Sequence, residues 1–479
     1  MFQKNKQQNK TPIYLKNTMS GEKEEFKPLM AGKVRMYNCG PTVYNELHIG
    51  NLRAYIFADT LRRTLEYNGY EVQQVINITD VGHLVADSED GEDKMEKRAK
   101  ETGGKAQDIA KQITSTFLDN LTSLGIDIKQ IEFPRATDYI KEQIEMTKTL
   151  LEKGYAYITD NGVAFDTALF KDYGKLGNID IEAQQTGSRV EQDPLKRNLS
   201  DFWLWKFNKS KKKRQQEWES PWGVGFPGWH LECSAMSRAL LGRQLDIHTG
   251  GIDHIPVHHN NEIAQSESVN GKKFVNYWMH NAFLMFDGKR FEKSTGHVLY
   301  LRQIIDRGYN PLALRYLLLS TNYDSEQNFT WDALEASSRA LLKLRKYYSD
   351  NLINIEVGDI SREYKENFIQ AINDNLGTPR GLALMWELVK DTEISNESKK
   401  ATLEDFNKVL GLHFTSNTIG AGKSKKLSAI PAKVTNLLKS REQARKDKNW
   451  EESDNLRDKI KGLGYEVIDD DSEQKLSTL

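Results

Sequence analysis

Cysteine is scarce in this 479-residue sequence, which contains only Cys39 and Cys233. Two thiols so far apart do not make the disulfide framework of a small secreted protein, which leaves buried apolar thiols, metal ligands or a nucleophile. Net charge is nearly absent, at −1, so a generally basic nucleic-acid-binding surface is excluded, although a local basic face is not. No apolar stretch reaches the ~18 residues of a membrane span, and the N-terminus lacks the apolar segment of a secretory signal. These absences predict a soluble, cytoplasmic protein.

The clearest structural pattern that is present lies in residues 34–80. Residues 34–37 and 72–78 are apolar runs typical of buried strands, and residues 51–68 between them carry apolar side chains at helical spacing up to Gly69. Strand, loop, helix and strand open a doubly wound sheet, which binds ligands at the carboxyl ends of its strands. The loop contains Cys39 and His48 and leads into a helix N-terminus, where phosphate is stabilised.

The chain is too long for one hydrophobic core, so several structural units are expected. We predict an N-terminal extension (1–33), an α/β core (34–330) with an insertion near 134–222, a helical region (331–414), a linker (415–428) and a small C-terminal domain (429–479). The basic tract 211–214 is most simply an exposed loop, and contact with a phosphate backbone is the alternative.

Seven of the ten histidines lie between residues 230 and 297, close in sequence to Cys233. His258 and Glu262 are four residues apart, which on a helix places both side chains on one face, as a metal site can use. With the two thiols the set is two sulfurs, one nitrogen and one oxygen, which suits zinc. Spacing alone leaves apolar buried cysteines and a hydrogen-bonded histidine open, because only the fold can bring the thiols together.

Several separated motifs carry a resemblance to a known family. They are CGPTVY (39–44), HIGN (48–51), NITDV (77–81), DFWLWK (201–206), GWHLECSAMS (228–237), NEIAQS (261–266), WMHN (278–281) and YNPLALRY (309–316). In this order they resemble the cysteinyl-tRNA synthetases, which are class I aminoacyl-tRNA synthetases. The resemblance implies a Rossmann-type doubly wound parallel sheet as catalytic core. An α-helical anticodon-binding domain, residues 331–414, and a small C-terminal α/β piece, residues 429–479, follow it.

The resemblance also implies ligands for zinc and for the substrate amino acid. The family's zinc ligands match Cys39, Cys233, His258 and Glu262. A bound zinc selects the thiolate of L-cysteine over the hydroxyl of serine, so no editing site is required. Three further residues match family positions around the cysteine pocket: Thr79, Trp229 and His248. Core packing is the simpler alternative for Trp229.

For ATP, which is bound as a substrate with Mg²⁺, the resemblance points to two loops. His48 and Asn51 resemble the HIGH motif of class I enzymes, and Gly251 and Asp253 resemble the ribose-binding turn. The KMSKS signature has its counterpart in residues 290–294, which we call the signature segment, where only Lys293 and Ser294 match. Arg290 replaces the first lysine and keeps the positive charge. The resemblance makes His48, Asn51 and Lys293 the catalytic residues. Of these, only Lys293 belongs to the signature-loop region, which we place near residues 285–330.

Two other functions remain as alternatives to the formation of cysteinyl-tRNA(Cys) by a monomeric enzyme. Related ligases couple cysteine to an amino-sugar, but they lack the long C-terminal region that this chain has. A synthetase paralogue with weakened activation could instead act as an RNA-binding protein, and the altered signature segment is the only feature that favours it.

Overall fold

The computed structural model describes residues 11–82, 98, 104–179, 194–209, 214–291, 296–414, 432–447, 449–462, 465–469 and 474–478. The chain divides into two compact units, residues 1–417 and 418–479, and each is described by itself. Among the described residues, no helix is both long and apolar enough to cross a membrane.

A five-stranded parallel sheet lies at the centre of the first unit. Its strands are β3 (Lys33–Asn38), β4 (Glu71–Ile76), β5 (Ile131–Glu132), β10 (Leu245–Gly251) and β11 (Val275–Asn281), in the order β11-β10-β3-β4-β5. From β3 the successive strands β4 and β5 add on one side of the sheet, whereas β10 and β11 add on the other side. The direction in which strands are added therefore reverses between β3 and β10. This reversal is the topological switch point where doubly wound sheets bind ligands, and it confirms the predicted fold class.

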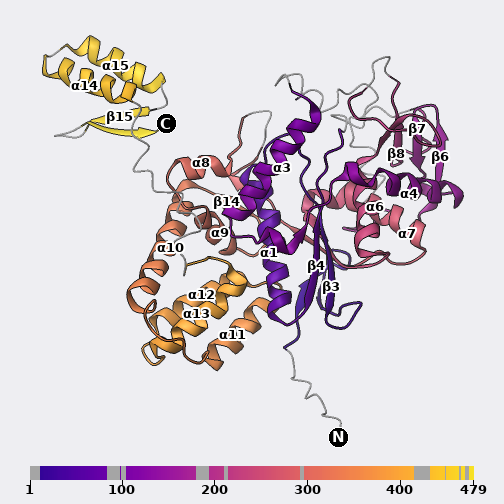
Figure 1. Cartoon of the computed structure of the whole chain (residues 1–479), viewed down its shortest axis with the longest axis horizontal. Helices are drawn as coiled ribbons and strands as arrows, with labels where there is room; N and C mark the ends of the chain where they lie inside the picture. Colours follow the sequence, from indigo (N-terminus) through magenta and orange to yellow (C-terminus); the bar gives the residue numbers. More distant parts are fainter. Residues whose placement is uncertain are drawn as a thin grey trace, which may run out of the picture. The chain divides into compact units, whose positions relative to one another are not determined.

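Helices cover both faces of this sheet (Figure 1). On one face α1 (Ile49–Tyr67) packs through Phe57 and Leu61 against Met36 of β3. On the other, α6 (Trp229–Leu241) and α7 (Asn260–Asn270) pack against Tyr37, the next residue of β3. Successive strand residues point to opposite faces, so a continuous apolar run is what a doubly covered strand requires.

The helix α1 begins two residues before the predicted start at Asn51. His48 is its N-cap: Nδ1 of His48 accepts the backbone N–H of Asn51 at 3.3 Å, and Oδ1 of Asn51 accepts the backbone N–H of His48 at 3.3 Å. This reciprocal capping satisfies amide groups that a helix start leaves unpaired. The helix ends before Gly69, which has a φ of 83°, as predicted from the sequence.

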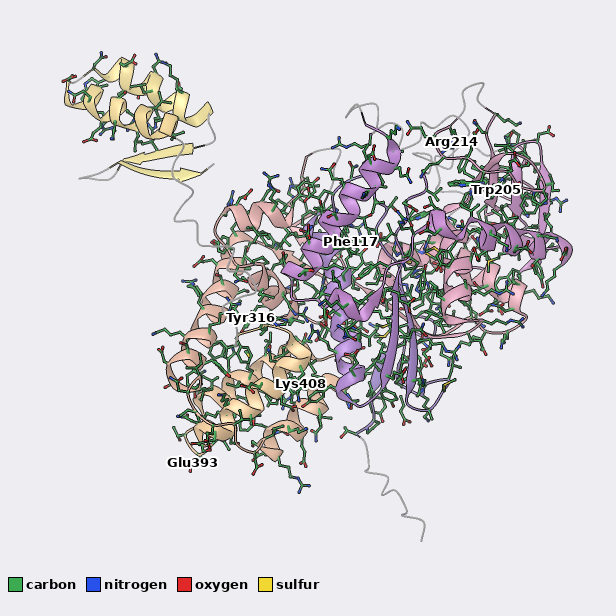
Figure 2. The ribbon with its side chains drawn as sticks, viewed as in Figure 1. Phe117, Trp205, Arg214, Tyr316, Glu393 and Lys408 are labelled. Atoms are coloured by element: carbon green, nitrogen blue, oxygen red, sulfur yellow. The ribbon has the colours of Figure 1, made fainter. Side chains whose placement is uncertain are left out.

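The insertion forms its own antiparallel sheet beside α4 (Ile140–Glu152). The strands are β6 (Ala156–Thr159), β7 (Gly162–Phe165), β8 (Phe202–Phe207) and β9 (Gly225–Pro227). Because β9 pairs with β8, the insertion extends beyond the expected end near residue 222. Trp205 is fully buried in its core (Figure 2). Of the basic tract, only Arg214 lies in the described residues: its guanidinium packs 3.7 Å from the ring centroid of Phe226 and donates to the carbonyl oxygen of Gly82 at 2.9 Å.

The first unit contains further elements outside the parallel sheet and the sheet of the insertion. They are β1 (Tyr14–Lys16), β2 (Lys23–Glu25), α3 (Ala106–Ser123), β12 (Leu284–Phe286), β13 (Lys289–Arg290), α8 (Leu301–Asp306), α9 (Pro311–Leu319) and β14 (Gln327–Phe329). The helical region follows as α10 (Trp331–Asn351), α11 (Arg362–Asn373), α12 (Thr378–Lys390) and α13 (Asn396–Leu410). The predicted linker 415–428 lies outside the described residues.

The second unit contains α14 (Ala432–Lys446), α15 (Trp450–Gly462) and a hairpin of β15 (Tyr465–Asp469) and β16 (Gln474–Thr478). Val434, Ile460 and Val467 form its buried core. This is the small α/β piece that the resemblance implied at the C-terminus.

Candidate active site

Four buried side chains with metal-binding atoms meet at the carboxyl edge of the sheet. Cys39 directly follows β3, Cys233 lies on α6 and Glu262 lies on α7. His258 is in a π-helical turn, Ile255–His259, that leads into α7. The ligand atoms of the four residues lie within 4.8 Å of one another. The fold therefore brings together the four predicted ligands from three separate parts of the sequence.

The local structure around His258 differs from the expected single α-helix. The π-helical turn precedes α7, yet Nε2 of His258 and Oε1 of Glu262 are 3.0 Å apart, so the pair still meets. Single π-helical turns of this kind are frequent at functional sites. The wider turn also buries the adjacent His259 completely.

A second group of four possible metal ligands shares Cys39 and Glu262 with the first. Cys39, His248, His259 and Glu262 also have ligand atoms within 4.8 Å of one another. Nε2 of His248 contacts Oε2 of Glu262 at 2.9 Å, and Nε2 of His259 contacts Sγ of Cys39 at 3.2 Å. His259 was not predicted as a site residue. The concentration of histidines between residues 230 and 297 was the only sequence signal for it.

The first group holds charges of both signs in a buried volume. Burial opposes ionisation of Glu262, but His248 and His258 attract its charge and lower its pKa to about 2. Burial likewise disfavours protonation of His258, yet Glu262 and Cys233 raise its pKa to about 10. A hydrogen bond with Cys39 lowers the pKa of the Cys233 thiol to about 7, against the effect of burial. Thiolate formation is therefore favoured at Cys233.

Behind Cys39 a line of hydrogen bonds reaches the N-terminal extension. Nδ1 of His259 contacts Nε2 of His280 at 2.7 Å, and Nδ1 of His280 contacts Oγ1 of Thr18 at 2.7 Å. Burial first, and then the neighbouring histidines, lower the pKa of both imidazoles well below the usual range, so both are neutral. If Thr18 donates to His280, then His280 donates to His259 and His259 donates to the sulfur, which satisfies every member.

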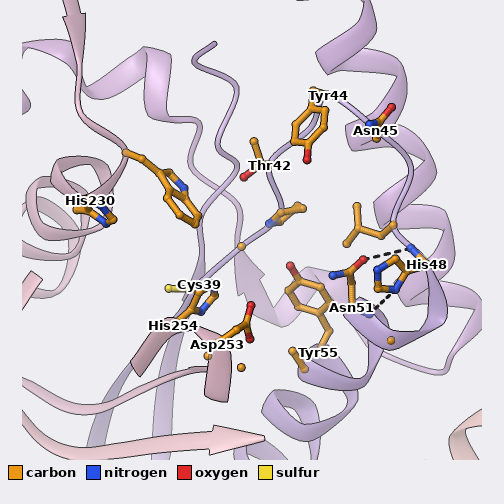
Figure 3. Close-up of a pocket in the computed structure, with 18 of the residues that line it drawn as sticks. Cys39, Thr42, Tyr44, Asn45, His48, Asn51, Tyr55, His230, Asp253 and His254 are labelled. Atoms are coloured by element: carbon orange, nitrogen blue, oxygen red, sulfur yellow. Dashed lines mark hydrogen bonds between the residues drawn. The ribbon is translucent and has the colours of Figure 1, made fainter. Parts of the chain in front are cut away.

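A pocket of about 500 Å³ connects this cluster to the N-terminus of α1. Cys39, Asp253 and His254 lie on one side in Figure 3, and His48 and Asn51 lie across from them. The pocket thus joins a sulfur of the candidate metal group to the first turn of a helix, whose free amide groups and dipole favour a phosphate.

Other predicted residues lie in or near the same pocket. Trp229, which is 38% exposed, lines it, and its ring centroid is 4.5 Å from that of His258. Gly251 also lines it, next to Asp253: a Cβ at Gly251 would lie 2.2 Å from Oδ1 of Asp253. Thr79 and His248 are buried close by. Thr79 accepts a hydrogen bond from Nδ2 of Asn77 at 3.1 Å through its hydroxyl.

The signature segment is described only at its start. Arg290 lines the pocket, and its guanidinium lies 4.2 Å from the ring centroid of Phe283. Lys293 and Ser294 lie outside the described residues. Phe291, which sequence reasoning did not single out, also lines the pocket and stacks on His48.

Two family models match the chain. The model described as "tRNA synthetases class I (C) catalytic domain" matches residues 25–339. The model described as "Cysteinyl-tRNA ligase anticodon binding domain" matches residues 427–475. The first covers the whole parallel sheet and its insertion, and the second falls in the small C-terminal unit.

Similar proteins agree with these models over nearly the full length. A cysteine–tRNA ligase 1 of Burkholderia lata is 44% identical over 467 residues, which is 97% of this chain and 97% of that protein. A cysteine–tRNA ligase of Treponema denticola is 40% identical over 96% of this chain and 98% of that protein. A crystal structure of Mycobacterium tuberculosis methionyl-tRNA synthetase with methionyl-adenylate matches 81% of this chain and 90% of its own, with 12% identity and a TM-score of 0.51. That structure supports the fold alone, whereas the family models and the relatives show that this chain belongs to the cysteinyl-tRNA synthetases of class I.

Proposed function

We propose that this chain activates L-cysteine with ATP to give cysteinyl-adenylate and pyrophosphate, and then transfers the cysteinyl group to the 3′ end of tRNA(Cys). The supporting observation is the pocket in which the cluster at Cys39 faces the first turn of α1. The substrate cysteine must be bound through its sulfur while its carboxylate attacks a phosphate of ATP. The thiol-containing cluster and the phosphate-binding helix start must therefore lie side by side.

The donor atoms of the first group fit a zinc ion. Two sulfurs, one imidazole nitrogen and one carboxylate oxygen within 4.8 Å suit the tetrahedral geometry and the soft ligands that zinc prefers. The second group offers only one sulfur, so we assign the metal to Cys39, Cys233, His258 and Glu262. A zinc ion there would bind the thiolate of cysteine and reject the hydroxyl of serine.

In the first step an oxygen of the cysteine carboxylate attacks the α-phosphorus of ATP, and pyrophosphate leaves. His48 supports this step through the N–H of its ring. Because Nδ1 accepts a hydrogen bond from the backbone N–H of Asn51, the proton of the neutral imidazole is on Nε2. That N–H, with the helix N-terminus, donates to phosphate oxygens as negative charge moves onto them. No covalent intermediate with the protein is needed.

The remaining predicted residues are assigned to ATP and to the amino acid. We propose that Gly251 and Asp253 bind the ribose, since a glycine is needed next to the Asp253 carboxylate. Arg290 and Lys293 would neutralise the triphosphate together with Mg²⁺, Ser294 would donate a hydrogen bond to it, and Lys293 would assist the departure of pyrophosphate. Trp229 would close over the bound cysteine, with Thr79 and His248 supporting the pocket from behind.

In the second step a hydroxyl of the terminal ribose of tRNA attacks the carbonyl carbon of the adenylate, and AMP leaves. Class I membership implies the 2′-hydroxyl. The resemblance predicted anticodon binding in the helical region 331–414. The anticodon-binding family model matches residues 427–475 instead, so we place anticodon contact there. We propose that the chain is divided into an extension, a core, a helical region, a linker and a C-terminal domain. We also propose that the protein is a monomer.

The two alternatives have less support. An amino-sugar ligase has no use for an anticodon-binding region, which this chain contains at residues 427–475. A pure RNA-binding paralogue has no use for two thiols, a histidine and a glutamate buried around one point.

Cysteine-dependent exchange of pyrophosphate into ATP, with zinc quantified in the same sample, tests the proposal. We expect exchange with cysteine, little with serine, and about one zinc per chain. Charging of tRNA(Cys), compared with an amino-sugar acceptor, then identifies the acceptor. A zinc-loaded protein without exchange would contradict the proposal in favour of the RNA-binding alternative.

A further inference from the structure

The first turn of α1 is covered by an aromatic ring from a distant part of the chain. Phe291 directly follows β13, and its ring stacks on the imidazole of His48 with 4.7 Å between centroids and 8° between planes. Nearly parallel rings at this distance attract each other beyond the burial of their area. The residue at the second position of the signature segment is therefore in direct contact with the proposed phosphate-binding histidine.

The contact depends on the absence of a side chain at Gly50. A Cβ built there would lie 2.8 Å from Cδ2 of Phe291 and 2.9 Å from Nδ1 of His48. The ring of Phe291 thus fills the space that a side chain in the first turn of α1 would occupy. Glycine at this position lets the signature segment approach the helix closely.

The stack continues away from the helix. Phe286 of β12 stacks on Phe291 with 5.7 Å between centroids and on His297 with 4.7 Å, and the His297 ring contacts the carbonyl oxygen of Phe286 through Nε2 at 2.8 Å. Phe291 and His297 flank residues 292–295 on either side. The aromatic stack therefore anchors both flanks of the segment that contains Lys293.

The chain that follows the signature segment, at residues 299–300, is also bound to the start of α1. The backbone N–H of Ile49 donates to the carbonyl oxygen of Leu299 at 2.9 Å, and His48 forms an isolated β-bridge with Tyr300. The cap hydrogen bond to Nδ1 of His48 is long, at 3.3 Å, and the χ2 torsion of histidine is broad. The stacked ring of Phe291 restricts that torsion in addition to the cap.

We infer that Phe291 is a positioning residue for cysteine activation. By stacking on His48 it fixes the plane of the imidazole, so that Nε2–H points at the phosphates, and it holds residues 290–291 against the first turn of α1. The inference rests on the proposed function. It assigns to Phe291 no contact with ATP, and its effect on the reaction passes through His48.

The test measures cysteine-dependent ATP–pyrophosphate exchange in Phe291→Leu, Phe291→Ala and Phe291→Tyr. Loss of the ring is expected to lower kcat/KM for ATP about 3- to 10-fold, the range that aromatic pairs contribute. The KM for cysteine and the zinc content should not change, and Phe291→Tyr, which keeps the ring, should stay within about two-fold of wild type. Phe133→Ala is the matched control, because Phe133 is also partly buried and packs on another ring, that of Phe117, outside the pocket.

A double-mutant cycle with His48→Asn separates positioning from simple packing. If Phe291 acts through His48, Phe291→Leu should have much less effect in the His48→Asn background than alone. Equal effects in both backgrounds, or values for Phe291→Leu and Phe291→Ala within about two-fold of wild type, would overturn the inference while leaving the proposed function intact. Absence of exchange in the wild-type protein would overturn the proposed function itself, and this inference with it.

Discussion

Asp59 on α1 and Arg315 on α9 form an ion pair in the interior, with 2.7 Å between Oδ2 and Nη2 and no more than 1% of either side chain exposed. Arg62 and Arg63 bind the same carboxylate, each at 2.7 Å. Nε of Arg315 also donates to the carbonyl oxygen of Leu410, the last residue of α13, at 2.8 Å. The helix α1, which His48 caps, is therefore fixed to the helical region through one buried carboxylate.

Removing the cation on α9 should destabilise the first unit. Arg315→Met would leave Asp59 buried with two of its three cations, at an expected cost of about 3 kcal/mol, the lower end for breaking a buried pair. Unfolding in urea measures this loss of free energy of unfolding. Arg362→Ala is the control: it removes an exposed pair with Glu366 on α11, and it should leave the free energy of unfolding nearly unchanged because exposed pairs contribute little. Equal losses in the two variants would contradict the structural role of Arg315.

The same carboxylate predicts how stability depends on pH. Burial alone would raise the pKa of Asp59, but Arg63, Arg315 and Arg62 attract its charge and hold the pKa well below its usual value. Because the folded pKa is below the unfolded value of about 3.9, the carboxylate stabilises the fold above that pH, and this contribution is lost as the pH falls further. The difference in free energy of unfolding between wild type and Asp59→Asn should therefore narrow below about pH 4. A constant difference from pH 7 to pH 3 would contradict this.

The two overlapping groups at the candidate metal site make different predictions. Cys233→Ala and His258→Asn should lose bound zinc, because each removes one of four ligands. His248→Asn and His259→Asn should keep zinc and weaken its affinity by about 10- to 100-fold, as removal of residues that orient the ligands does. Zinc per chain after dialysis against a graded chelator measures both effects. Zinc loss on His259→Asn, with zinc kept on Cys233→Ala, would show that the second group is the metal site.

The altered signature segment predicts a kinetic cost. Glu292 adds a carboxylate to the signature segment, for which we propose triphosphate binding. Its negative charge would oppose that of the phosphates there, so ATP affinity or activation should be weaker than with serine at this position. Glu292→Ser should lower the KM for ATP or raise kcat. Asp306→Ser, an exposed acidic residue on α8, is the control and should have no effect. An unchanged KM and kcat in Glu292→Ser would contradict the prediction.

The sequence predicted the core accurately because local patterns specify it. Apolar runs marked β3 and β4, because their residues lie between helices on both faces of the sheet. The spacing of Leu52, Leu61 and Leu65 marked α1, because these side chains are buried in the core. The exact start of α1 was missed because capping by His48 is unusual among N-cap residues.

The site was predictable only in part. Cys39 and Glu262 are 223 positions apart, and no periodicity joins them, so the ligand group depended on the resemblance until the fold was known. The contacts of His259 with Cys39 and of His280 with Thr18 could not be predicted, because they follow from the pairing of β10 with β11 and β3. Likewise the stacking of Phe291 on His48 joins segments whose approach is set by the turn after β12.

The most direct test of the central claim, that the buried thiol cluster selects cysteine through its sulfur, uses Co²⁺ in place of Zn²⁺. Visible absorption of the Co²⁺-loaded protein reports on the sulfur ligands of the metal. Adding cysteine should increase the sulfur-to-metal absorption, because a third thiolate joins Cys39 and Cys233, whereas serine at the same concentration should leave the spectrum unchanged. Equal spectra with cysteine and serine, or a Cys233→Ala protein with the wild-type spectrum, would contradict the claim.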